Sequence, residues 1–395
     1  MLKAEKRPIP IRIYNGIFSI INSNRELDFD RLLRSASANT GLDYLGTDFN
    51  DHALRLLIQS INEEAKLNPF GKLMIKEKLI GQLENRLWAE HWFKCYPEIL
   101  EQQLLPIYLI TGLQRTGTTK MQRLLSRQTG ARPLLSWEAL YPAPLDKPDE
   151  RAKRQKRTVR NAKAVKYISP VFQSIHPIVP NEPEEDVLLL DVHFMSTSSE
   201  AIMHVPTYAN WLDQQDQSQA YSYEKKLLQL LQWQQSGSFW VLKSPHHLQY
   251  LKDFTKVFPN SKIVWMHREI EQCVPSFLSM LFYSRGMFSD IVHRQDLIFH
   301  WIKKLSAMLE AGILFRKQNA SSVLDVKFSA LMEQEQNEVE RIFPTMELKK
   351  EMSQETLSAS NRYVSKHKYH LKDWGLSITE LHDKFQKYIE LYNGL

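Results

Sequence analysis

The chain has 395 residues, of which 43% are hydrophobic and 24% are charged, so a disordered chain is excluded and the length suits one large domain or two ordinary ones. The formal net charge of +6 is mild and favours an anionic ligand without implying nucleic acid. The two cysteines, Cys95 and Cys273, are too few for a disulfide framework or a zinc site.

The beginning of the chain lacks the pattern of a secretory signal peptide, and no window reaches the run of about 18 apolar residues that spans a bilayer. We therefore expect a cytoplasmic protein without a transmembrane segment. Residues 9–24 are rich in isoleucine. We expect this segment to pack on the body of the protein as a strand or a helix, the alternative being a helix that binds a partner or a membrane surface.

Residues 1–100 are predicted to form a helical region. Apolar residues recur at helical spacing from Leu54 to Ala65 and again from Leu73 to Leu87, and an Asn-Pro pair separates the two runs. We expect this region to pack on one domain that spans residues 101–395.

After Pro106 the pattern changes to short apolar runs that alternate with amphipathic helices. Three such runs end in "LITG", "WVLK" and "WMHR". This alternation predicts an α/β fold that is P-loop-like and three-layered, with helices on both sides of a central parallel sheet. Because ligands of such sheets bind at the carboxyl ends of the strands, the residues that follow each run are candidates for the site.

The first run leads into the loop "GLQRTGTT" and a helix. Gly112 and Gly117 let the backbone turn closely around an anion, and the start of the helix adds its positive dipole. The loop has the two glycines of a Walker A loop, but Thr118 stands where the lysine belongs. Arg115 supplies positive charge from inside the loop, and Thr118 and Thr119 can donate hydroxyl hydrogen bonds.

The third run is followed by Arg268, and Ser276 comes eight residues later, about two turns along if a helix begins nearby. An arginine and a hydroxyl at a strand end suit a second anion; the other interpretation is an arginine that caps the strand or forms a surface ion pair. Two anion sites at one sheet edge indicate a ligand with two separated phosphate-like groups.

These segments resemble the sulfotransferases that use 3′-phosphoadenosine-5′-phosphosulfate (PAPS), and most of all a broad group of sulfotransferase family proteins common in bacteria. "SASANTGLDYLG" and "KHKYHLKDWGLS" resemble the terminal regions of that group, so the likeness covers nearly the whole chain. The resemblance implies that PAPS is the donor and that no metal ion is required. It assigns the 5′-phosphosulfate to Arg115, Thr116, Gly117, Thr118 and Thr119, and the 3′-phosphate to Arg268 and Ser276.

The resemblance also implies candidates for the chemical step. Glu138 matches the position of a glutamate base in related enzymes that act on proteins and carbohydrates, and a surface or helix-capping role is the alternative. Lys243, at the end of the second run, matches a lysine placed near the bridging oxygen. His247 is the rival base, since the pKa of histidine lies near working pH. The acidic run 184–186 is predicted to stabilise a helix start and is an outside candidate for contacting the acceptor.

The segment 151–166 is the strongest run of positive charge and is predicted to be a helix. It is either a solvated face or a basic rim that draws in an anionic acceptor. Its basic face consists of Lys153, Lys156, Arg160 and Lys163, and the side predicted to face the body consists of Val159, Ala162 and Val165.

The sequence thus predicts an enzyme that transfers a sulfuryl group from PAPS to a hydroxyl or amine of a small-molecule, lipid or glycan acceptor. A nucleoside-triphosphate-dependent kinase and a nucleotide-binding module without catalysis are the alternatives. Against the kinase, Thr118 replaces the lysine, and none of the three runs ends in the aspartate that a Mg²⁺ site needs. The basic residues Lys366, His367, Lys368 and His370 either fold over the donor or form a solvated turn.

Overall fold

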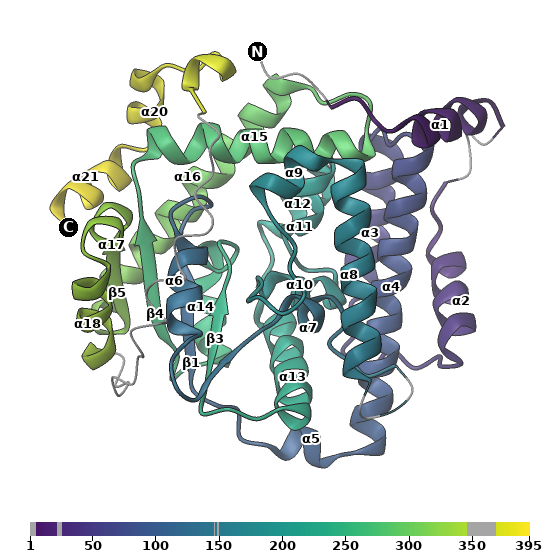
Figure 1. Cartoon of the computed structure of the whole chain (residues 1–395), viewed down its shortest axis with the longest axis horizontal. Coiled ribbons are helices and arrows are strands. Elements are labelled where there is room, and N and C mark those ends of the chain that lie inside the picture. Colours follow the sequence, from purple (N-terminus) through teal and green to yellow (C-terminus); the bar gives the residue numbers. More distant parts are fainter. Residues whose placement is uncertain (1–4, 22–25, 146, 148–149, 346–368) are drawn as a thin grey trace.

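Five parallel strands form the centre of the computed structural model, in the spatial order β2-β3-β1-β4-β5 (Figure 1). They are β1 (Ile107–Thr111), β2 (Ala131–Pro133), β3 (Phe239–Lys243), β4 (Lys262–His267) and β5 (Val323–Lys327). The α/β fold with a parallel central sheet is confirmed, and the three predicted runs are β1, β3 and β4. The sequence does not indicate the two edge strands, because β2 has only three residues and β5 carries a charged residue, Asp325, at its centre.

The structure describes residues 5–21, 26–145, 147, 150–345 and 369–395. The helices before the sheet are α1 (Ile9–Ile21), α2 (Phe29–Thr40), α3 (Asp51–Glu64), α4 (Pro69–Cys95) and α5 (Glu98–Glu101). Those between β1 and β3 are α6 (Thr118–Leu125), α7 (Ser136–Leu140), α8 (Arg151–Ile168), α9 (Pro170–Ile175), α10 (Val187–Leu190), η1 (Asp191–His193), α11 (Ser198–Ile202), α12 (Pro206–Leu212) and α13 (Ser218–Gln234).

The helices after β3 are α14 (His247–Val257), α15 (Ile270–Phe288), α16 (Arg294–Gln318), η2 (Ala320–Ser322), α17 (Phe328–Glu333), α18 (Glu335–Thr345), η4 (Leu371–Trp374), α20 (Ile378–Lys384) and α21 (Gln386–Gly394). Among the described residues, no helix is long and apolar enough to cross a membrane. The predicted basic turn at Lys366, His367 and Lys368 lies outside the described residues.

The sheet is buried on both sides, which explains the continuous apolar runs of its central strands. All residues of β1 and β3 are buried. Because side chains alternate along a strand, Ile107 and Leu109 join one hydrophobic core while Tyr108 and Ile110 join another, which α6, α17 and α18 cover. The carboxyl ends of β1, β3 and β4 are therefore held rigidly side by side.

The first hundred residues are largely helical, and α2, α3 and α4 lie on the side of the molecule away from β5 (Figure 1). The start of α4 has a clear local cause. Asn68 accepts a hydrogen bond from the backbone N–H of Gly71 at 2.8 Å, and Pro69 occupies the first turn, where its missing N–H costs nothing. Buried side chains of these helices share one hydrophobic core with those of α13, α14 and α15.

The basic run forms α8 and exposes Lys153, Lys156, Arg160 and Lys163, as predicted, and Val165 packs on the body, but one of the predicted inward residues does not. Its buried side chains are Arg154, Thr158 and Ile168. Val159, predicted to face the body, is 39% exposed, so that prediction is wrong. Arg154 takes the inward position because its guanidinium donates a hydrogen bond to the carbonyl of Tyr141 at 3.0 Å and lies 4.6 Å from the ring centre of Trp137.

Candidate active site

The glycine loop connects β1 to α6, and both of its glycines are required by close neighbours. Gly112 has a φ of 138°, and a Cβ there would lie 2.4 Å from the carbonyl oxygen of Met266 on β4. Gly117 has a φ of 92°, and a Cβ there would lie 2.5 Å from the ring of Phe328. The predicted strand, loop and helix are confirmed, and no other residue type fits these two positions without strain.

The threonines of the loop differ in what they offer a ligand. Thr116 is buried, and its hydroxyl donates to the carbonyl of Leu113 at 2.7 Å, so it holds the shape of the loop. Thr118 is buried and Thr119 is exposed, and together they begin α6. Backbone N–H groups of the first turn of a helix lack intrahelical partners and attract an anion.

Arg115, Arg268 and Ser276 meet beside this loop. The φ of Arg115 is 72°, a left-handed value that is uncommon for a residue with a side chain. Its Nε donates to the hydroxyl of Ser276 at 3.1 Å, and Arg268 donates to the carbonyl of Arg115 at 2.9 Å. The guanidinium of Arg268 also stacks over Phe328, 4.2 Å from the ring centre. Residues that are 153 and 161 positions apart in the sequence thus form one cationic cluster.

Lys243 ends β3, next to β1 in the sheet. Its side chain is 2% exposed, and its ammonium donates to a carboxylate oxygen of Glu185 at 2.6 Å. Glu185 is 25% exposed, so the pair lies at the boundary between the protein interior and solvent. A buried lysine is costly unless it is paired, and here its partner is itself open to a ligand.

The segment that carries Glu185 is held by polar contacts to two helices. The side-chain amide of Gln122 on α6 donates to the carbonyl of Glu184 at 2.9 Å, and the hydroxyl of Ser136 on α7 donates to the Glu184 carboxylate at 3.1 Å. The sequence suggests Glu185 only weakly, as part of an acidic run. Its pairing with Lys243 joins residues 58 positions apart and needs the structure.

Glu138 lies in a different setting from the one the resemblance implies. It is 1% exposed, and its two carboxylate oxygens accept hydrogen bonds from Arg132 at 2.6 and 2.8 Å. One of them also accepts from the backbone N–H of Leu135 at 3.0 Å, which makes it the capping residue of α7. Both oxygens of this carboxylate are held by Arg132 and one also by Leu135, and the side chain has almost no surface that an acceptor could reach, so the geometry favours the helix-capping role.

Replacement of Glu138 by alanine is therefore expected to lower the free energy of unfolding by about 3–5 kcal/mol, because Arg132 would remain buried without its partner. Urea unfolding followed by circular dichroism measures this. Unchanged stability together with complete loss of sulfuryl transfer would restore Glu138 as the base.

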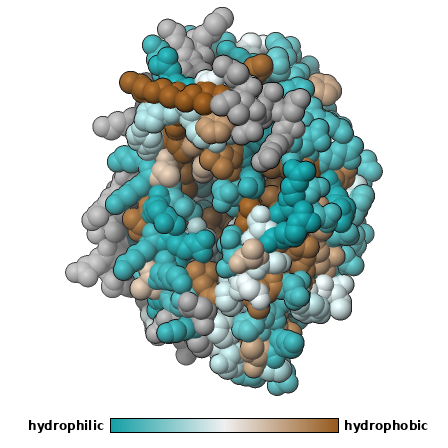
Figure 2. Space-filling model, turned by 90° about the vertical axis from the view of Figure 1, so that its right-hand side faces the viewer, coloured by the Kyte–Doolittle hydropathy of each residue, from teal (hydrophilic) through white to brown (hydrophobic). Residues whose placement is uncertain are grey.

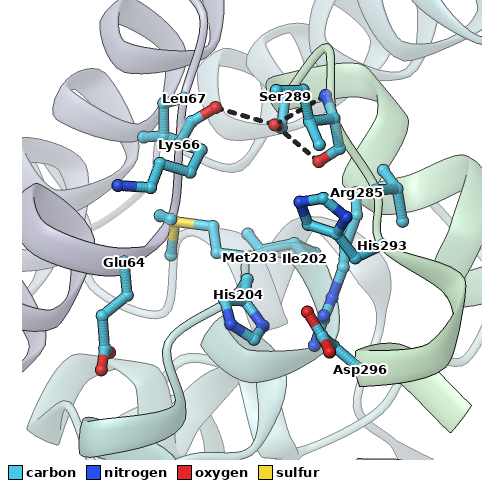
Figure 3. A pocket seen from close by; sticks show the side chains of 13 residues that line it. Glu64, Lys66, Leu67, Ile202, Met203, His204, Arg285, Ser289, His293 and Asp296 are labelled. Carbon is cyan, nitrogen blue, oxygen red and sulfur yellow. Dashed lines mark hydrogen bonds between the residues drawn. The ribbon is translucent and has the colours of Figure 1, made fainter.

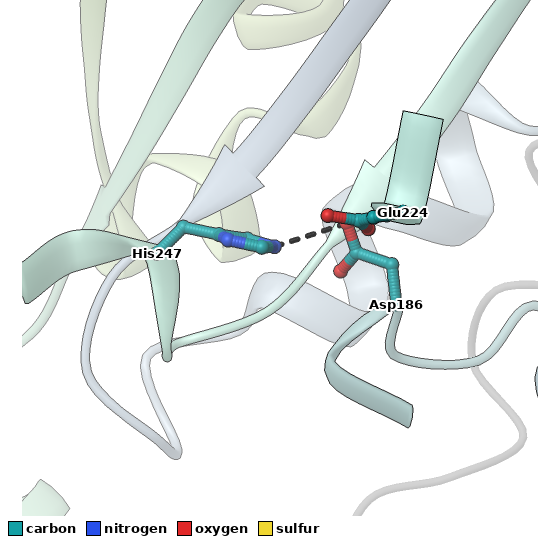
Figure 4. A group of neighbouring side chains, drawn as sticks. All are labelled: Asp186, Glu224 and His247. Carbon is teal, nitrogen blue, oxygen red and sulfur yellow. Dashed lines mark hydrogen bonds and ion pairs between the residues drawn. The ribbon is translucent and has the colours of Figure 1, made fainter. Parts of the chain in front are cut away.

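His247 belongs to a buried polar cluster with Asp186 and Glu224 (Figure 4). Its Nδ1 is 2.9 Å from the hydroxyl of Tyr221, and its Nε2 is 3.0 Å from the Asp186 carboxylate. With no exposed surface and both ring nitrogens engaged, the imidazole is poorly placed to receive a proton from an acceptor. The cluster instead holds Asp186, the residue that follows Glu185, in a fixed position.

Glu224 completes this cluster without a counter-ion of its own. Its two oxygens and Oδ1 of Asp186 are buried and have no hydrogen-bond partner among the described residues. Burial and the adjacent Asp186 raise the pKa of Glu224 well above its ordinary value of 4.5. One ligand atom from each of Asp186, Glu224 and His247 lies within 4.8 Å of the others, so either a cation or a proton shared by the two carboxyls can relieve the charge.

We predict that the carboxyls of Asp186 and Glu224 share a proton, and two substitutions of Glu224 test this. Glu224→Gln supplies a neutral donor of the same shape and should change stability by less than about 1 kcal/mol, whereas Glu224→Ala should lose about 2–4 kcal/mol. In the wild type, stability should fall as the pH rises above 4.5, because the unfolded chain releases a proton that the folded chain keeps. Glu224→Gln should lose that part of the pH dependence. Urea unfolding between acid and neutral pH measures both effects, and a metal found by mass spectrometry that disappears in Glu224→Gln would contradict them.

His246 is the other histidine near Lys243. Its Nδ1 is 3.2 Å from the hydroxyl of Thr197, while its buried Nε2 has no hydrogen-bond partner in the described part of the chain. Burial and the neighbouring His247 lower its pKa well below the usual value of 6.5. It is therefore a neutral imidazole with weak basicity.

A pocket of about 400 Å³, counted with its open mouth, lies between the end of α3, the end of α11 and the turn that follows α15 (Figure 3). Apolar and ionisable side chains share its wall, including Met203, Ile291, His204, Arg285 and Asp296. Burial and the nearby Arg285 lower the pKa of His204. Ile202, the last residue of α11, lines this pocket. Thr197, the residue before α11, is hydrogen-bonded to His246. The pocket is therefore one short helix away from the strand ends.

Comparisons with known proteins identify the family of the chain. A family model described as "Sulfotransferase family" matches residues 106–351. The crystal structure of sulfotransferase STF1 from Mycobacterium tuberculosis H37Rv is similar, with 29% sequence identity, a TM-score of 0.79, and coverage of 91% of this chain and 98% of that one. Sulfotransferase STF9 from Mycobacterium avium shares the fold, with 21% identity, a TM-score of 0.81, and coverage of 92% and 98%.

No curated protein gives a significant match. The family model covers more than half of the chain, including the glycine loop, Lys243, Arg268 and Ser276. The chain belongs to the sulfotransferase family.

Proposed function

We propose that this protein transfers a sulfuryl group from PAPS to a hydroxyl or amine of an acceptor. The observation that carries the proposal is the meeting of Arg115, Arg268 and Ser276 beside the glycine loop. This cluster adds a second anion site to the one at the start of α6. PAPS needs two such sites, because its ribose carries one phosphate at the 3′ position and the phosphosulfate at the 5′ position. A nucleoside triphosphate carries its phosphates in one chain and has no use for the second site.

In this proposal the 5′-phosphosulfate lies on the backbone N–H groups at the start of α6 and near the hydroxyls of Thr118 and Thr119. The 3′-phosphate is held by Arg268 and Ser276. Arg115 stands between the two sites, because it belongs to the loop and its side chain reaches Ser276. Arginine suits this position, since its planar group can bond two oxygens of a phosphate at once.

The chemical step is an in-line displacement at sulfur. A bond forms between the acceptor oxygen or nitrogen and sulfur, and the bond from sulfur to the 5′-phosphate oxygen breaks. Lys243 stabilises the negative charge that develops on the departing phosphate, which leaves as part of 3′,5′-adenosine diphosphate. We assign the proton of the acceptor to the carboxylate of Glu185, which is partly exposed and adjoins Lys243. This scheme requires no metal ion.

Glu185 replaces Glu138 and His247 as the proposed base. Glu138 is committed to Arg132, and His247 to Tyr221 and Asp186. Glu185, in contrast, bonds a lysine that has further protons to donate. A base within hydrogen-bond reach of the acceptor and a cation near the leaving oxygen are what the reaction needs.

Arg268→Ala and Ser276→Ala test the 3′-phosphate site. Each substitution should weaken binding of 3′,5′-adenosine diphosphate by about tenfold or more, because charge-assisted hydrogen bonds to that phosphate are lost. Binding of 5′-adenosine monophosphate, which lacks the 3′-phosphate, should change little. Isothermal titration calorimetry with both nucleotides measures this, and an equal loss for both would contradict the assignment.

The acceptor is proposed to be a small molecule, a lipid or a glycan that approaches Lys243 and Glu185 from the side of α11. The pocket beside α11 has apolar walls next to ionisable groups, which suits an amphiphilic molecule better than a purely polar one.

A further inference from the structure

Helix α1 presents a row of isoleucines to solvent. Ile9, Ile13 and Ile17 are 68%, 57% and 49% exposed, and they recur every four residues, so they lie on one side of the helix. We call them the isoleucine row. Figure 2 shows apolar atoms in a line along this helix. Single exposed apolar residues are ordinary, but three in one row form a continuous patch.

The exposure does not come from a loosely attached segment. Ile11, on the opposite side of α1, is 5% exposed and packs with Ile168 and Met287. The side chain of Asn15 accepts a hydrogen bond from the backbone N–H of Phe70 at 2.8 Å. Both faces of α1 are thus apolar, and only the inner one is covered by the protein.

Positive charge lies near the isoleucine row. Lys6 and Arg12 are exposed beside it, and Lys163 and Lys166 are exposed on the last turns of α8. This end of α8 lies next to α1, because its Ile168 packs with Ile11. None of these four cations has a hydrogen bond or ion pair with any residue that the structure describes.

Two acidic groups near α1 are already engaged. Glu5 accepts hydrogen bonds from Ser169 and from the backbone N–H of Val171, and Asp290 is paired with Arg7. Their carboxylates therefore do not neutralise the lysines of α8 or the cations beside the isoleucine row. In the part of the chain that the structure describes, this surface therefore combines an apolar row with nearby cations that have no ion pair.

We propose that this surface docks on an anionic lipid bilayer. A helix with an exposed apolar side and flanking lysine and arginine is suited to lie in the membrane interface, with its apolar side chains below the headgroups. The exposed Tyr167 near Lys166 suits the same interface. At 13 residues, α1 is too short to cross the membrane but long enough to lie on it.

A second copy of the chain explains the surface less well. In a two-fold dimer the same patch meets itself, so the cations around one isoleucine row would face those around the other. An anionic bilayer covers the apolar side chains and satisfies the cations together.

The docking surface adjoins the pocket described above. Arg7, just before α1, donates to the carbonyls of Gly286 and Ser289 at 2.7 Å each, and Ser289 and Ile291 line the pocket. Ile291 is 56% exposed. The docking itself does not depend on the transfer reaction. The corollary, that the acceptor is a lipid or lipid-linked molecule entering this pocket from the bilayer, rests on the proposed function.

Vesicle co-sedimentation of the full chain tests the docking. The wild type should bind vesicles of phosphatidylcholine and phosphatidylglycerol at about 2:1 but not vesicles of phosphatidylcholine alone, and binding should weaken at high salt. The triple variant Ile9→Ser, Ile13→Ser, Ile17→Ser should bind about tenfold less. Lys163→Gln with Lys166→Gln should reduce the preference for the anionic lipid.

The matched control is the triple variant Phe299→Ser, Leu314→Ser, Ile378→Ser, which removes side chains of comparable exposure from α16 and α20 and should bind vesicles like the wild type. Vesicle binding that survives loss of the isoleucine row would overturn the proposal. So would a wild type that dimerises through this row, shown by light scattering, and ignores vesicles. Binding of 3′,5′-adenosine diphosphate is measured on every variant. A protein that binds vesicles but not this nucleotide would contradict the proposed function and leave the membrane docking supported.

Discussion

Replacement of Lys243 by methionine is expected to lower kcat for sulfuryl transfer by about 10²–10³-fold, because in the proposed mechanism this lysine stabilises the charge on the departing phosphate. Lys243 ends β3 and is almost fully buried, so water cannot replace its ammonium group easily. Methionine keeps the length and apolar character of the side chain. Initial rates with sulfur-labelled PAPS measure the effect.

The fold should survive this substitution, because Glu185, the partner left behind, is 25% exposed and can be hydrated. Binding of 3′,5′-adenosine diphosphate should change much less than kcat, since that product lacks the reacting sulfuryl group. Full turnover in Lys243→Met would remove the lysine from the mechanism. An equal loss of nucleotide binding would make it a binding residue instead.

Glu185→Gln is expected to lower kcat by about 10²–10⁴-fold with little change in donor affinity, because glutamine cannot accept the proton of the acceptor. The amide oxygen can still accept the hydrogen bond from Lys243, so the local structure should persist. The matched control is Glu182→Gln, which removes a charge from the same segment at a residue that is 42% exposed and pairs with Arg123.

A normal rate in Glu185→Gln would exclude this carboxylate as the base. His246→Asn then becomes the informative variant, since His246 follows Lys243 closely in the chain and its Nε2 has no hydrogen-bond partner among the described residues. Loss of activity there, with Glu185→Gln active, would assign the base to the histidine.

The central part of the fold, and the sheet edge at which the proposed donor-site residues lie, could be predicted from sequence because local signals mark them. An apolar run followed by a glycine loop and a helix specifies β1, the cradle and α6. Arg268 and Lys243 each follow directly after such a run. Once the strands are parallel, their carboxyl ends meet at one edge, so these residues converge whatever the rest of the chain does.

The environment of the candidate bases could not be predicted in this way. Glu138 reads as a possible base in the sequence, and its commitment to Arg132 depends on β2, which is too short to leave an apolar pattern. The pairing of Glu185 with Lys243 joins a loop to a strand across 58 positions. Such contacts are set by tertiary packing, which no local spacing records.

The isoleucine-rich segment shows the same limit. Its sequence indicates a helix that packs on the body or one that binds a partner or membrane. The structure gives α1 both an inner face, through Ile11, and an outer one, through the isoleucine row. When a helix is apolar on both sides, its sequence does not indicate which side packs on the protein and which side faces solvent.

The most direct test of PAPS dependence uses two labelled donors in parallel. The protein is incubated with an extract of its source organism and either sulfur-labelled PAPS or γ-phosphate-labelled ATP with Mg²⁺, and Lys243→Met serves as the blank. Labelled product is expected from PAPS with the wild type and not with the variant, and none above the blank from ATP. Transfer of phosphate from ATP by the purified chain, with no transfer from PAPS, would contradict this account.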